Sequence, residues 1–284
     1  MTLASLLLVL GSGLAHALWN FFAKKSEDKS VFLWAMFIPS TIVLLPTLLT
    51  ELAQVSFTPK ATILISLSLL IQSIYAWLLS NTYKQGDLSQ VYPIMRGTST
   101  LLIPVLGVVV LQESLPFWGW MGILSMLTGF IVMSGWSGRI GRSQTTMKPI
   151  LFALSVGLCT TCYTLVDKQS LAYLSPPALL EITNIGFILG LTPTVLASGR
   201  LKQVVRNQWR TMLIGAVLSP GSYLLFLFAV QHTQVSYLAP LREVGIVFGT
   251  LLGLIFLKEK QGIRRIAASV IVVVGIIMIA TSGS

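Results

Sequence analysis

The stretch "YPIMRGTSTLLIPVLG" at residues 92–107 places one charged residue, Arg96, inside a run of apolar and small residues. A guanidinium group stays charged at physiological pH, so within hydrocarbon it requires a counter-ion, water or a ligand. The fold and the role of Arg96 therefore depend on the sequence that surrounds this run.

The surrounding sequence is apolar throughout. Of the 284 residues, 54% are hydrophobic and 10% are charged, whereas a soluble domain contains about 25% charged residues. Apolar runs of roughly 20 residues, each long enough to cross a bilayer, recur from end to end. These runs are too long and continuous for barrel strands and predict an all-α integral membrane protein.

Charged residues and Pro or Gly breaks divide the chain into ten predicted transmembrane helices. They cover residues 3–23, 31–50, 61–82, 89–111, 116–136, 149–167, 178–198, 210–230, 236–257 and 264–281. No basic residue precedes the first span and no small-residue cleavage site follows it, so we expect a retained helix rather than a signal peptide. Cys159 and Cys162 lack a second pair or a histidine cluster, so we interpret them as packing residues and expect no metal or cofactor.

Lys and Arg are distributed unequally among the predicted connections. Fifteen of the 19 lie after spans 1, 3, 5, 7 and 9, two (Lys60 and Lys168) lie on the opposite side, and Arg96 and Arg242 lie within spans. Cytoplasmic loops carry an excess of basic residues. We therefore expect a multi-pass protein of the inner (plasma) membrane with both termini extracytoplasmic, and we attribute the net charge of +10 to topology rather than to a nucleic-acid partner.

The two halves of the chain are weakly similar. A shift of 146 residues aligns "MRGTSTLLIPVLGVVVLQES" with "LREVGIVFGTLLGLIFLKEK" and pairs Arg96 with Arg242, and a shift of 144 aligns "GLAHALWNFFAKKS" with "GLCTTCYTLVDKQS". Each half contains five spans, so the second half enters the membrane in the opposite sense. The pattern predicts two inverted five-helix repeats, residues 1–137 and 148–284, joined by a cytoplasmic linker at 138–147.

These features resemble the drug/metabolite transporter superfamily, and in particular its EamA-type ten-helix members. The resemblance rests on the two five-helix halves and on a fourth-helix pattern that ends in glutamate, "VYPIMRGTSTLLIPVLGVVVLQESL" and "YLAPLREVGIVFGTLLGLIFLKEKQ". It implies a secondary carrier of amino acids, nucleotide sugars, sugar phosphates, drugs or other small metabolites. Members often keep both termini in the cytoplasm, in contrast to the orientation that the charges predict here.

Arg96 and Arg242 are the first candidates for a substrate site between the two repeats. Their planar guanidinium groups suit carboxylate, phosphate or phosphonate groups. The alternative is that they are structural charges, satisfied by carbonyl groups and lipid headgroups. Glu243 is a candidate proton-coupling group or, alternatively, a counter-ion for one of the arginines.

The first span carries Ser12, His16 and Asn20 at four-residue steps, and therefore on one helix face. Such a face borders either a wet cavity or another helix to which it donates hydrogen bonds. His16 is a second candidate for proton coupling, with packing as its alternative. The further candidates for substrate binding are Trp19, Asn20, Tyr92, Tyr163 and Thr164, to which the family resemblance adds Gln72, Tyr75 and Tyr223 on helices expected to line the cavity.

The chain lacks the GxxxxGK[ST], HExxH and GxSxG patterns, so we expect neither an enzyme nor an ATPase. The leading interpretation is a secondary active transporter that moves a small metabolite, such as an amino acid or another carboxylate- or phosphate-bearing solute, by alternating access. It would work in the lipid bilayer as a monomer or a homodimer. A membrane scaffold or lipid-interacting protein is the alternative, and an intramembrane enzyme acting on phospholipid is a third, for which no set of acid, base and nucleophile is evident.

Overall fold

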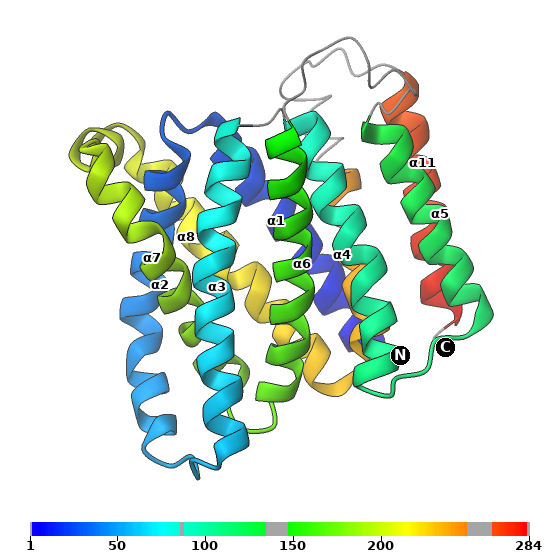
Figure 1. Cartoon of the computed structure of the whole chain (residues 1–284), viewed down its shortest axis with the longest axis horizontal. Helices are drawn as coiled ribbons and strands as arrows, with labels where there is room; N and C mark the ends of the chain where they lie inside the picture. Colours follow the sequence, from blue (N-terminus) through cyan, green and yellow to red (C-terminus); the bar gives the residue numbers. More distant parts are fainter. Residues whose placement is uncertain (1, 86–87, 135–146, 249–262, 283–284) are drawn as a thin grey trace.

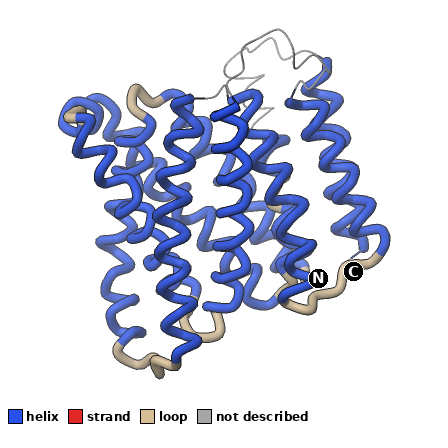
Figure 2. Tube along the Cα trace, viewed as in Figure 1, coloured by secondary structure: helices blue, strands red, loops and turns tan. Residues whose placement is uncertain are grey.

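A computed structural model describes residues 2–85, 88–134, 147–248 and 263–282 (Figure 1). Within these ranges every regular element is a helix and no strand occurs, which confirms the all-α prediction (Figure 2). The helices described in these ranges are α1 (Leu3–Lys25), α2 (Lys29–Leu52), α3 (Pro59–Gln85), α4 (Leu88–Val110), α5 (Phe117–Ser134), α6 (Met147–Ser170), α7 (Pro176–Ser198), α8 (Leu201–His232), α9 (Val235–Leu241) and α11 (Ile263–Ser282).

The surface of the helix bundle is suited to lipid. Among the described helices, α1 to α8 are long and apolar enough to cross a membrane. Large apolar side chains point outward along them, and Val43, Leu196 and Val217 are each 72% exposed. Apolar surface on this scale is stable in contact with hydrocarbon rather than water, so the chain is a multi-pass membrane protein.

Helix ends follow local sequence signals. Asp28 caps α2, because its Oδ1 accepts hydrogen bonds from the backbone N–H groups of Ser30 (3.0 Å) and Val31 (3.2 Å). Ser175 precedes α7, whose first residue is a proline, and Gly199 ends it in the left-handed conformation at φ 61°. These short connections bring consecutive helices back across the bundle in opposite directions.

Two helices differ from the predicted spans. α8 begins at Leu201, nine residues before the predicted start, because a basic segment joins it across a non-helical residue, Gln208. α9 ends at Leu241, and Arg242 and Glu243 form a turn before helical residues 244–248. The predicted ninth span is thus interrupted at its arginine, and its residues 249–257 lie outside the described part.

The interruption has a local cause. Pro240 has no N–H to donate to the preceding turn. Beyond it, Glu243 N donates to the carbonyl oxygen of Pro240 (3.0 Å) and Gly245 N to that of Arg242 (3.2 Å), which are three-residue bonds of the tighter 3₁₀ type. The regular α-helical hydrogen bonding is therefore interrupted at Arg242 and Glu243.

Helices of the two chain halves are interleaved. α1 packs against α8 and α3 against α6, while α7 packs against both α2 and α3. α5 and α11 pack together at one edge of the bundle (Figure 1). The start of α1 and the end of α11 lie at the same end of the molecule.

Two glycines at matched positions of the repeat permit close helix contacts. A β-carbon on Gly13 would lie 2.9 Å from the carbonyl oxygen of Arg242, and one on Gly157 would lie 2.9 Å from that of Met95. Small residues let membrane helices approach to this distance. α1 is thereby held against the break after α9, and α6 against α4.

Glu113, in the connection between α4 and α5, anchors the start of α9. Its carboxylate accepts hydrogen bonds from the backbone N–H groups of Val235 and Ser236, each at 2.8 Å, and from the Ser236 hydroxyl at 2.6 Å. The anchored start and the Gly13 contact together fix where Arg242 enters the bundle.

Candidate functional site

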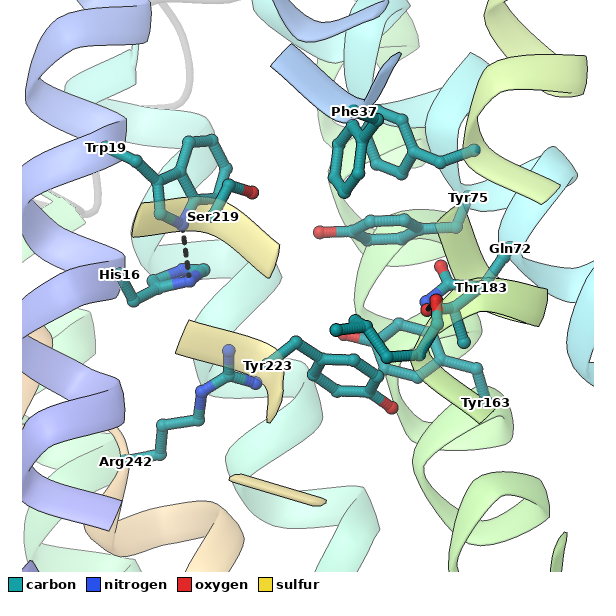
Figure 3. Close-up of a pocket in the computed structure, with 12 residues that line it drawn as sticks. His16, Trp19, Phe37, Gln72, Tyr75, Tyr163, Thr183, Ser219, Tyr223 and Arg242 are labelled. Atoms are coloured by element: carbon teal, nitrogen blue, oxygen red, sulfur yellow. Dashed lines mark hydrogen bonds between the residues drawn. The ribbon is translucent and has the colours of Figure 1, made fainter. Parts of the chain in front are cut away.

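A small cavity lies within the bundle. It has a volume of about 50 Å³ and is lined by residues from α1, α2, α3, α6, α7 and α8 and by Arg242: His16, Trp19, Phe37, Gln72, Tyr75, Tyr163, Leu180, Thr183, Phe187, Ser219, Tyr223 and Arg242 (Figure 3). One water molecule needs roughly 10–15 Å³ of such space, so a few waters fit. A metabolite would require the surrounding helices to move apart.

The structure brings together seven of the twelve sequence candidates in the wall of this cavity: His16, Trp19, Gln72, Tyr75, Tyr163, Tyr223 and Arg242. The other five lie outside the wall: Asn20, Tyr92, Arg96, Thr164 and Glu243.

Arg242 is the cation that borders the cavity. Its guanidinium carbon lies 5.5 Å from the ring centre of Tyr223 and 4.8 Å from that of Phe226, and one terminal nitrogen donates to Ser222 Oγ at 3.1 Å. Its buried Nε has no hydrogen-bond partner in the described part of the chain. The aromatic faces partly offset the charge, and the guanidinium keeps one N–H donor that is buried and unpaired among the described residues.

Arg96 is neutralised by a carboxylate from the other half of the chain. Its Nε lies 2.7 Å from Glu243 Oε2, and the two side chains are 11% and 5% exposed. Tyr92, one turn earlier on α4, lies under the guanidinium with its ring centre 5.9 Å away. The pair therefore ties α4 to the break after α9, and Arg96 offers the cavity no free charge.

The three polar residues on one face of α1 lie in three different environments. Ser12 bonds across to α8, where its hydroxyl donates to the Ser222 carbonyl at 2.7 Å. His16 lines the cavity, and its Nδ1 accepts from Trp19 Nε1 at 3.2 Å (Figure 3). Asn20 donates to the carbonyl of His16 at 2.8 Å and accepts from the Tyr83 hydroxyl at 3.4 Å.

Aromatic rings form the opposite wall. The ring centres of Tyr75 and Tyr163 are 5.3 Å apart, and those of Tyr163 and Tyr223 are 5.8 Å apart, both edge to face. Phe187 continues the series 6.1 Å from Tyr75. Figure 3 shows the hydroxyl of Tyr75 directed across the cavity toward the side that carries Trp19 and His16.

Uncharged polar groups complete the wall. Thr183 and Ser219 border the cavity, and Gln72 contributes a buried Oε1 that lacks a hydrogen-bond partner among the described residues. An unpaired buried polar atom is costly, which is typical of a group kept for a ligand. Thr164 instead donates to the carbonyl oxygen of Thr160 on its own helix at 2.7 Å.

Asp167 is a buried charged group that the sequence interpretation missed. It is 1% exposed, and its carboxylate accepts from Ser68 Oγ at 2.6 Å and from the hydroxyl of Tyr223 at 2.5 Å. In the sequence it is adjacent to Lys168, close to a predicted span end. Its position one helical turn after Tyr163 is the signal that could have revealed it.

The described residues contain no group of three His, Cys, Asp or Glu side chains that could hold a metal ion. What the site offers is a mixture of aromatic faces, hydroxyl and amide groups and one cation. Binding sites for small molecules commonly combine apolar and aromatic walls with a few polar groups in this way.

Comparison with known proteins identifies the type of domain. The model of the EamA-like transporter family matches residues 147–281. The chain carries an EamA-like transporter domain. The match confirms the resemblance inferred from the sequence over the second half of the chain, and it supports a membrane transporter.

Two individual proteins resemble this EamA-like chain. A protein of Lactobacillus johnsonii named "Putative sugar uptake protein" is 25% identical over 219 residues, which cover 70% of this chain and 72% of the relative. A solved crystal structure shares the fold with a TM-score of 0.76 at 12% identity, covering 100% of this chain and 98% of that one.

Proposed function

We propose that this EamA-like protein is a secondary active transporter that moves a small polyhydroxylated solute of the sugar type by alternating access. The observation that carries the proposal is the cavity, where aromatic faces, uncharged polar groups and Arg242 converge between apolar helices. Carriers built from inverted repeats place their substrate near the bilayer midplane, between the repeats.

The packing of the helices supports two inverted repeats at residues 1–137 and 148–284, with a linker at 138–147. The repeat makes α6 the counterpart of α1 and α8 the counterpart of α3. The contact between α1 and α8 therefore corresponds to the contact between α6 and α3, and both are present. The close approaches at Gly13 and Gly157 correspond in the same way. Rocking of such halves about the cavity would expose it to each side in turn.

The orientation follows from the basic residues. The connections at 53–58 and 171–175, on the side of the termini in Figure 1, contain no Lys or Arg. We therefore propose that the termini are extracytoplasmic and that the membrane is the plasma membrane. We propose that the protein works as a monomer or a homodimer, with one cavity in each chain.

The wall chemistry favours a sugar. A sugar ring presents C–H groups on its faces, which suit the electron-rich faces of Trp19, Tyr75 and Tyr163. Its hydroxyl groups suit the amide of Gln72 and the hydroxyl of Ser219. The name of the Lactobacillus johnsonii relative, which refers to sugar uptake, agrees with this substrate class.

A solute with a carboxylate or phosphate group is the second candidate. It is favoured by Arg242, whose Nε has no partner among the described residues. A sugar acid would satisfy both this donor and the aromatic wall. A scaffold that only binds lipid gives no account of a cavity within the bundle where Arg242, Gln72 and Ser219 meet aromatic side chains.

The proposal is tested with the purified protein in proteoliposomes, using radiolabelled D-glucose, D-gluconate and L-glutamate as probes. We expect saturable uptake of glucose or gluconate, and its loss in Arg242→Ala. Arg210→Ala is the matched control, because Arg210 is exposed on the same bundle near the start of α8. A stable protein that shows no saturable flux of any probe would refute the function and favour the scaffold.

A further inference from the structure

Among the buried carboxylates of the described residues, Asp167 combines two features: it has no cationic partner, and it is hydrogen-bonded to a residue of the cavity wall. Glu243 is paired with Arg96, Glu113 accepts backbone N–H groups, and Glu181 accepts from Asn184 Nδ2 at 3.1 Å. Asp167 is held by two neutral hydroxyl groups. One of these, on Tyr223, belongs to a residue of the cavity wall.

The neighbouring charges do not neutralise Asp167. Lys168 turns away and donates to the carbonyl oxygens of Val230 (2.6 Å) and Thr233 (3.1 Å). No Lys, Arg or His in the described ranges forms an ion pair with Asp167. The other titratable or charged groups on α6 and on the elements packed against it are Lys148, Cys159, Cys162, Tyr163 and Lys168 (α6), Lys60, Tyr75, Tyr83 and Lys84 (α3), Tyr92 and Arg96 (α4), Lys202, Arg206, Arg210, Tyr223 and His232 (α8), and Tyr237 with the adjoining Arg242 and Glu243 (α9).

Burial without a cation makes the charged form of Asp167 depend on its two hydrogen bonds. A carboxylate removed from water is stabilised by hydroxyl donors but is readily neutralised by a proton. Ionisable groups within a membrane commonly serve proton movement. Asp167 is thus both protonatable and linked by one hydrogen bond to the cavity.

We propose that Asp167 is the proton-binding site that couples solute transport to a proton gradient, with Tyr223 as the link to the solute. The proposal rests on the transport function proposed above. In the charged state, the single O–H of Tyr223 is used to donate to Asp167 Oδ2.

Protonation reverses this bond. A proton from the cavity is taken up at the Tyr223 oxygen as Tyr223 passes its own proton to Asp167 Oδ2, so one proton is bound and one charge is lost. The carboxylic acid now donates to the Tyr223 oxygen, and the tyrosine O–H is free to donate to a hydroxyl group of the solute. Proton and solute therefore strengthen each other's binding, as reciprocal linkage requires, which gives symport.

The first test needs no substrate. Infrared spectra of the purified wild-type protein should show a protonated carboxyl band that grows as the pH falls. Asp167→Asn should lose the component of this band that belongs to Asp167, and Glu181→Gln, which alters a buried carboxyl group outside the cavity wall, should retain that component. A difference spectrum between the wild type and Asp167→Asn that contains no titrating carboxyl component would overturn the proposal.

The second test measures coupling in proteoliposomes, with radiolabelled D-glucose as the probe. An inside-alkaline gradient of one pH unit supports about tenfold accumulation per coupled proton. We expect this accumulation in the wild type and in Glu181→Gln. Asp167→Asn should retain counterflow of glucose without accumulation, because the amide can donate to Tyr223 and mimic the protonated state.

The outcomes separate the two proposals. Counterflow without any response of the wild type to the gradient, or accumulation that persists in Asp167→Asn, would refute the coupling and leave the transport function intact. Absence of counterflow in the wild type would refute glucose transport, while the infrared titration still decides on proton binding. If Asp167→Asn does not fold, Ser68→Ala removes one donor to the charged form and should shift the midpoint of the titration to higher pH; an unshifted midpoint would contradict the proposal.

Discussion

The ion pair between Arg96 and Glu243 gives a quantitative prediction about stability. Its nitrogen–oxygen distance is 2.7 Å, and the two side chains are 11% and 5% exposed. An exposed pair of this kind contributes about 0–1 kcal/mol, but removal of one partner of a buried pair costs about 3–5 kcal/mol, because the other charge is left without compensation. Since both side chains lie close to complete burial, we expect Glu243→Gln to lower the free energy of unfolding by an amount in the second range.

The assay is reversible unfolding in detergent micelles, followed for the wild type, Glu243→Gln and the double variant Arg96→Met with Glu243→Leu. The double variant removes both charges and should regain most of the stability, because apolar residues often replace a buried pair at little cost. Glu27→Gln, at an exposed position, is the control. A loss in Glu243→Gln no larger than that in the control would refute the reasoning that the pair is desolvated.

Further predictions concern the cavity and the helix contacts. Arg242→Lys keeps the charge but loses the planar fork over the aromatic rings, so solute affinity measured by calorimetry should fall about tenfold, and unchanged affinity would contradict the assignment. Gly13→Ala should lower the unfolding free energy by about 1–3 kcal/mol, because its β-carbon would meet backbone 2.9 Å away. Gly221→Ala, with no atom within 4 Å of the new carbon, should be neutral or stabilising, and equal effects of the two would argue against the close contact. Gln72→Leu should reduce solute affinity without loss of stability, since it removes a buried oxygen that has no partner among the described residues, and a less stable protein would contradict this.

Much of the fold follows from hydropathy, because long apolar runs have few alternatives to a membrane helix. The exceptions are set by local geometry. α8 extends back to Leu201 because a basic segment continues helically across Gln208, which a count of apolar residues does not register. The break after α9 depends on how Arg242 and Glu243 are accommodated once Pro240 has removed a donor.

The site was predictable where the repeat or the family resemblance marked a residue. Arg242 and Trp19 were found through their repeat counterparts, and both line the cavity. The ion pair between Arg96 and Glu243 was not predictable from the sequence. The two residues are 147 positions apart, and Glu243 could equally have paired with its neighbour Arg242. Asp167 was hidden by the adjacent Lys168, since only the structure shows that the two side chains have separate partners.

The central claim is that the solute binds in the cavity within the bundle. Ser219→Phe would fill a space of about 50 Å³ without removing any charge, whereas Val217→Phe, two residues away on α8, points outward at 72% exposure. The decisive measurement is counterflow in proteoliposomes of the sugar or sugar acid that the wild type transports. The account predicts loss of counterflow in Ser219→Phe and wild-type counterflow in Val217→Phe; full counterflow in a stably folded Ser219→Phe protein would show that the solute takes another route.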